Sequence, residues 1–157
     1  MRWLLSFLSS AALVACLSAA SRAAELPYDE HANATDQVRQ ALQEAHAAHR
    51  DVLLVFGANW CPDCRVLDSA LHKASAINDR FVIVKVDVGN FDKNLDLAKR
   101  YDVPLRKGIP AAAVVSGDDT VLYVTKAGEL ANAHRMGESA IVDFFSRMVA
   151  DASAAAH

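Results

Sequence analysis

The sequence predicts an α/β fold, a three-layer α/β/α sandwich with a mixed central sheet. Two apolar runs of strand length, at 51–58 and 80–88, alternate with segments whose apolar residues recur at helical spacing. Two further strand-like runs, at 111–116 and 121–126, flank a Gly-Asp-Asp turn, which is typical of an antiparallel hairpin. A parallel βαβ half followed by a hairpin and a closing helix gives this architecture.

The helices are predicted from the same periodicity. The first covers 34–50, with Thr35 or Asp36 placed to cap it. The others are expected at 65–76, at 94–102 and at 138–150, after which 151–157 should form a frayed tail. The final helix should turn four apolar residues inward: Ile141, Phe144, Phe145 and Met148.

The first 24 residues have the character of a secretory signal peptide. Arg2 precedes an apolar run, and small residues around Ala20, Ala23 and Ala24 offer cleavage points. Two alternatives are a membrane anchor, for which the run is just long enough, and a lipoprotein signal that ends before a lipidated Cys16. Each alternative takes the protein out of the cytoplasm, so we expect a periplasmic or secreted domain at 25–157, lipid-anchored if Cys16 is modified.

Length and charge exclude some classes of protein. The 157 residues suffice for one domain with a sizeable core. The net charge is −3 and no basic run stands out, so we expect no nucleic-acid partner.

The folded domain keeps two cysteines, Cys61 and Cys64. An even number of cysteines outside the cytoplasm usually forms structural disulfides. A bridge over so short a loop adds little stability, however, which favours a chemical role. Zinc would need further ligands at suitable spacing, and the sequence shows none, so no metal site is expected. Binding of Cu(I) by two thiolates stays open.

The pair lies where a buried strand ends and a helix begins. Unpaired N–H groups and the helix dipole stabilise a thiolate there, so Cys61 is expected to be the nucleophile and Cys64 the resolving thiol. Pro62 suits the first helical position. Asp63 suits the first turn and also places a negative charge near the thiolate.

Two stretches, "VLLVFGANWCPDC" and "GIPAAAVV", resemble the active-site strand and the proline loop of the thioredoxin family over roughly residues 34–150. The resemblance implies the thioredoxin fold and a thiol–disulfide oxidoreductase that acts on protein disulfides without a bound cofactor. It implies a cis Pro110, with the Ile109 backbone offered to the substrate. It also implies that Lys85 matches a lysine of the central strand, as an ion-pair partner or a tuning group. Trp60, directly before Cys61, is either a core aromatic or, as its position favours, a shield over the disulfide at the surface.

The departures from the family indicate a specialised member. Val55 stands where cytoplasmic thioredoxins carry a buried aspartate, and Pro-Asp separates the cysteines where Gly-Pro is common. We expect a monomeric periplasmic protein. Because Asp63 should destabilise the Cys61 thiolate and make the couple more reducing, we expect a reductant or isomerase rather than a strong oxidant, served by a membrane electron donor. The alternative is a non-catalytic module on the same fold, such as a Cu(I)-handling or adaptor protein.

Overall fold

The computed structural model describes residues 26–155, and the predicted signal peptide and Cys16 lie outside this range. Two short 3₁₀ helices, η1 (Leu105–Lys107) and η2 (Ala133–Arg135), lie in connections. The other elements, in chain order, are α1 (Ala34–Ala48), β1 (Asp51–Gly57), α2 (Pro62–Lys73), α3 (Ser75–Arg80), β2 (Phe81–Asp87), α4 (Leu95–Arg100), β3 (Ala111–Ser116), β4 (Val121–Val124) and α5 (Glu138–Ala155).

The four strands form one mixed sheet in the order β2-β1-β3-β4. β1 pairs with β2 in parallel, whereas β1–β3 and β3–β4 are antiparallel. The right-handed crossover expected of a parallel pair is made by α2 and α3. The predicted βαβ half and hairpin are therefore confirmed.

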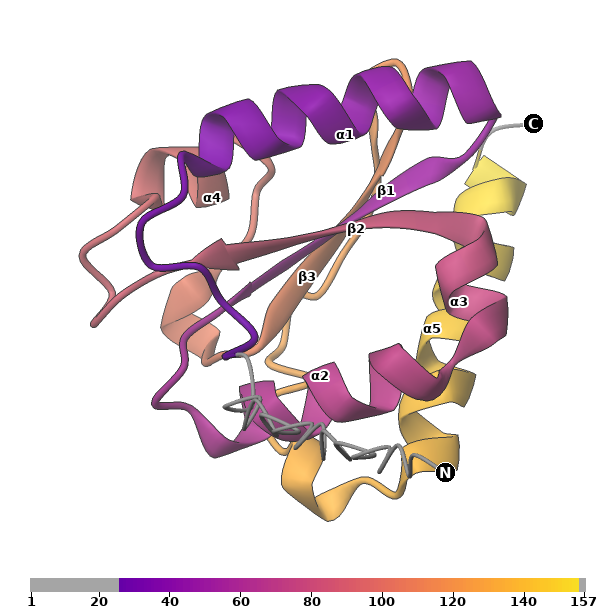
Figure 1. Cartoon of the computed structure of the whole chain (residues 1–157). Coiled ribbons are helices and arrows are strands. Elements are labelled where there is room, and N and C mark those ends of the chain that lie inside the picture. Colours follow the sequence, from indigo (N-terminus) through magenta and orange to yellow (C-terminus); the bar gives the residue numbers. More distant parts are fainter. Residues whose placement is uncertain (1–25, 156–157) are drawn as a thin grey trace, which may run out of the picture.

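Helices cover both faces of the sheet, with α1 and α4 on one side and α2, α3 and α5 on the other (Figure 1). Successive side chains of a strand point to opposite faces. Val52, Leu54 and Phe56 thus join one buried cluster with residues of α1 and α4. Leu53 and Val55 join a second cluster with residues of α2, α3 and α5. A central strand buried on both faces explains the unbroken apolar run at 51–58.

The helix predicted from the periodicity at 65–76 ends earlier in the structure, whereas its start at Pro62 agrees with the first helical position expected for that residue. α2 begins at Pro62, and the chain breaks at Ala74 (φ −87°, ψ 80°) before α3 starts. Asn78 stabilises the break because its side-chain amide donates to the carbonyls of Leu71 (2.8 Å) and Ala74 (3.1 Å). Both carbonyls also accept backbone N–H groups, that of Leu71 from Ala74 and that of Ala74 from Ile77 and Asn78, so the Asn78 side chain adds further hydrogen bonds across the break.

The C-terminal tail also differs from expectation. α5 runs on to Ala155, so 151–155 is helical rather than frayed, in keeping with the high helix propensity of alanine. Ile141, Phe145 and Met148 are buried, as predicted. Phe144 is only half-buried and packs edge-on against Phe145, with ring centroids 5.5 Å apart.

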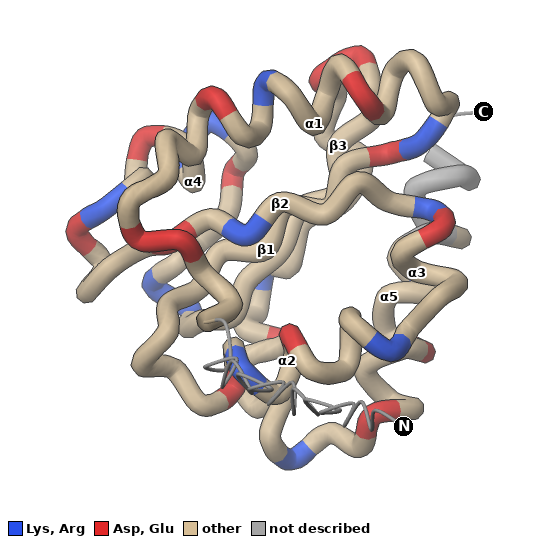
Figure 2. Tube along the Cα trace, viewed as in Figure 1, with Lys and Arg blue, Asp and Glu red and all other residues tan. Residues whose placement is uncertain are grey.

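Lys and Arg are interspersed with Asp and Glu along the described chain (Figure 2). Among the described helices, none combines the length and the apolar character that crossing a membrane requires.

Candidate active site

Cys61 and Cys64 form a disulfide at the N-terminus of α2, with their Cα atoms 5.3 Å apart. Cys61 is the N-cap of the helix, and its sulfur accepts a hydrogen bond from the backbone N–H of Cys64 (3.2 Å). Pro62 occupies the first turn, where its missing N–H costs nothing. A thiolate formed on Cys61 would therefore meet an N–H donor that is already aimed at it.

The two sulfurs differ in their surroundings. Cys61 is 3% exposed, whereas Cys64 is completely buried. The sulfur of Cys61 lies 3.6 Å from the carbonyl oxygen of Ile109, and the Ile109–Pro110 peptide bond is cis, as the resemblance implied. The proline loop therefore lies directly against Cys61, the more exposed of the two cysteines.

Trp60 lies on the surface beside the disulfide, with 53% of the residue exposed. Its indole N–H donates to the carbonyl of Gly89 (2.9 Å), and its ring meets Phe91 edge-on at 6.1 Å. The loop after β2 thus holds the indole in place.

The Asp63 carboxylate is held by His134 of η2, an interaction that the sequence did not indicate. One oxygen accepts from the backbone N–H of His134 (2.7 Å) and lies 2.6 Å from its ring Nδ1. The two residues are far apart in the chain, so no local pattern could pair them. The Asp63 carboxylate is therefore held against His134 rather than left without a partner near Cys61.

Lys85 forms an ion pair with Asp68 of α2, and its ammonium lies 3.4 Å from the ring of His72. Lys85 stands next to Val55 in the sheet register. The carboxylate that pairs with this lysine thus comes from the helix that carries the cysteines. Lys85 thus has the ion-pair partner that a lysine on a buried strand requires.

The lead-in segment, residues 26–33, is fastened to the site by Asn59. The Asn59 side chain accepts from the N–H of Tyr28 (3.0 Å) and donates to its carbonyl (2.8 Å). It also donates to the Glu30 carboxylate (2.8 Å), while Lys93 donates to the Glu30 carbonyl (3.2 Å). Tyr28 and Asn59 were missed from the sequence because neither carries a motif.

We predict that Asn59→Ala lowers the free energy of unfolding by about 2–3 kcal/mol. The substitution leaves the buried N–H and carbonyl of Tyr28 without partners, and an unsatisfied buried group costs about 1–3 kcal/mol. Urea unfolding measures the change, with exposed Asn90→Ala as the control, expected within about 0.5 kcal/mol of wild type. Equal stability of the two variants would show that the hydrogen bonds of Asn59 contribute nothing to the free energy of unfolding.

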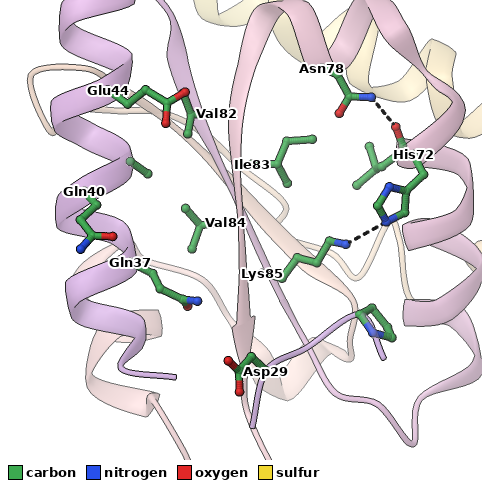
Figure 3. A pocket seen from close by; sticks show the side chains of 13 residues that line it. Asp29, Gln37, Gln40, Glu44, His72, Asn78, Val82, Ile83, Val84 and Lys85 are labelled. Atoms are coloured by element: carbon green, nitrogen blue, oxygen red, sulfur yellow. Dashed lines mark hydrogen bonds between the residues drawn. The ribbon is translucent and has the colours of Figure 1, made fainter. Parts of the chain in front are cut away.

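A pocket of about 500 Å³ lies between α1 and the α2–α3 helices, along β2. Lys85 and His72 line one side, and Gln37, Gln40 and Glu44 of α1 line the other (Figure 3). Neither cysteine lines it. Within residues 26–155, no group of three or more His, Cys, Asp or Glu side chains is placed to hold a metal ion.

The site combines a CxxC disulfide at a helix N-cap with a cis-proline loop, on this four-stranded sheet. This combination defines a thioredoxin-like thiol–disulfide oxidoreductase. The family model described as thioredoxin-like matches residues 33–117. The chain belongs to this thioredoxin-like family.

Two solved structures show the relationship. A disulphide isomerase from Xylella fastidiosa is 53% identical, with a TM-score of 0.77, over 81% of this chain and 99% of that chain. The thioredoxin Deadhead from Drosophila melanogaster is 20% identical, with a TM-score of 0.50, over 72% of this chain and 92% of that chain, and supports the fold alone. No curated protein sequence matches the chain.

Proposed function

We propose that this protein reduces or isomerises disulfides of other proteins outside the cytoplasm, with Cys61 as the nucleophile and Cys64 as the resolving thiol. The observation that carries the proposal is the hydrogen bond from the Cys64 N–H to the Cys61 sulfur at the helix N-cap. The same donor that caps the helix stabilises the Cys61 thiolate. The likeness to a protein named as a disulphide isomerase supports this reading.

The remaining residues of the site have supporting roles in this proposal. The Ile109 carbonyl and the neighbouring Pro110 line the approach to Cys61, where a client chain would lie. Trp60 and Phe91 provide the exposed apolar rim. The signal peptide predicted at 1–24 supports a periplasmic location, where a membrane protein would return electrons to the pair and complete the cycle.

Turnover of a protein disulfide is the direct test. We expect the purified domain to reduce insulin, or to reactivate a protein with scrambled disulfides, when a reductant recycles the pair. Stoichiometric Cu(I) binding without turnover would instead favour the non-catalytic module.

We predict a reduction potential on the reducing side of protein disulfide isomerase, which lies near −180 mV. A negative charge near the Cys61 thiolate disfavours the reduced form, and a less stable reduced form makes the couple more reducing. Equilibration with glutathione or dithiothreitol of known ratio gives the value. A potential near that of DsbA, about −120 mV, would overturn the assignment as reductant or isomerase.

We further predict that Asp63→Asn lowers the Cys61 pKa and raises the potential. Solvent screening near the surface should keep the effect below about 1 kcal/mol, roughly 20 mV. The amide oxygen of asparagine can still accept from the His134 N–H, so the fold should hold. Asp96→Asn, the same change in the first turn of α4, is the control and should shift neither quantity.

A further inference from the structure

The Tyr28 hydroxyl and the Cys64 sulfur lie side by side at Gly57. A Cβ placed on Gly57 would stand 2.2 Å from the Tyr28 hydroxyl oxygen and 2.8 Å from the Cys64 sulfur. The two atoms are thus no farther apart than the sum of these distances. Gly57 leaves the space between them free of any side chain, and Tyr28 itself is only 3% exposed.

The surroundings keep this phenol protonated. Burial raises its pKa well above the usual range, and the nearby carboxylates of Asp68 and Asp87 act in the same direction. Each carboxylate is itself paired with a lysine, Asp68 with Lys85 and Asp87 with Lys93. The hydroxyl is therefore a hydrogen-bond donor throughout the working pH range.

Cys64 needs such a donor during the resolving step. Its sulfur is completely buried, and the strand position that carries an aspartate in cytoplasmic thioredoxins is here the apolar Val55. A buried thiolate without hydrogen bonds is costly. In the oxidised protein the Cys64 sulfur is uncharged. It requires a hydrogen-bond donor only when the thiolate forms.

We propose that the Tyr28 hydroxyl donates a hydrogen bond to the Cys64 thiolate as Cys64 attacks the mixed disulfide, an inference that rests on the proposed function. In that step a bond forms between the Cys64 and Cys61 sulfurs, and the bond between Cys61 and the client sulfur breaks. The client thiolate leaves with the electron pair, and the proton released by Cys64 balances its charge. Tyr28 keeps its own proton.

The test titrates Cys64 alone. In a Cys61→Ser background, Tyr28→Phe removes the hydroxyl and keeps the ring, and the thiolate absorbance is followed against pH. Hydrogen bonds to charged groups are among the strongest in proteins. Loss of this one in Tyr28→Phe should therefore lower the Cys64 thiolate fraction at a given pH about tenfold or more. The same substitution in a Cys64→Ser background should leave the Cys61 titration unchanged.

Tyr101→Phe is the matched control. Tyr101 is also buried, but its hydroxyl donates to Asp119 (2.8 Å), away from the thiols. Its loss should leave both titrations unchanged. If Tyr28→Phe likewise leaves the Cys64 titration unchanged, the proposal is overturned.

A second variant covers the case in which Tyr28→Phe does not fold. Site-specific 3-fluorotyrosine at position 28 makes the phenol more acidic and a stronger donor, and should raise the Cys64 thiolate fraction at a given pH. An unchanged or lower fraction would contradict the proposal. No client protein enters these titrations, so their failure is distinct from a failure of the turnover assay.

Discussion

Cys61→Ser is expected to abolish the reduction of protein disulfides, by at least about a thousandfold. Serine cannot supply a thiolate at neutral pH, and the buried Cys64 cannot reach a client in its place. The insulin assay measures the loss. Circular dichroism should show an intact fold, because a bridge over so short a loop contributes little stability.

Cys64→Ser should behave differently, although it also stops turnover. Cys61 still attacks the client, but nothing then resolves the mixed disulfide, so the covalent complex accumulates. Non-reducing electrophoresis with a single-disulfide client reports the complex. Equal trapping by Cys61→Ser and Cys64→Ser proteins would mean that the roles of the two thiols are assigned wrongly.

Phe145→Ala is expected to lower the free energy of unfolding by about 3–5 kcal/mol, the usual cost of truncating a fully buried phenylalanine. The ring lies in the second cluster, in which α5 covers the sheet. α5 also packs against α2, the helix that carries the cysteines. Thermal or urea unfolding of the reduced and oxidised proteins measures the loss.

The neighbouring Phe144 supplies the control for this prediction. It is half-buried and its main partner is the ring of Phe145, so Phe144→Ala should cost only about 1–2 kcal/mol. The comparison separates loss of core volume from loss of an aromatic side chain on α5. A larger effect at Phe144 would mean that the packing of α5 is described wrongly.

Most of the fold could be predicted from periodicity, because the central strands are buried on both faces and the helices on one. The break between α2 and α3 could not. No glycine or proline marks Ala74, and the Asn78 side chain that bonds to the Leu71 and Ala74 carbonyls belongs to no recognisable sequence pattern. The helical end of α5 at 151–155 was also not predicted, although its alanines favour helix.

For the site, the Cys61–Cys64 pair and the proline loop were visible because they are local motifs. The partners that surround them are not local. His134 reaches Asp63 from beyond the hairpin, and Tyr28 reaches Gly57 from before the first helix. Such contacts depend on the packing of distant segments, and a single sequence carries no signal for them.

The hydrogen bonds from Asn59 to Tyr28 and Glu30 bear on where the functional domain of this protein begins. The family match starts at residue 33, yet Tyr28 and Glu30, which Asn59 binds, precede it. Transplanting the stretch from Asn59 to Cys64 into another thioredoxin would therefore carry over the two thiols but not the peptide that Asn59 holds or the phenol beside Cys64. The redox centre is therefore assembled from separate pieces of chain, and the segment needed to build it begins several residues before the match to the family begins.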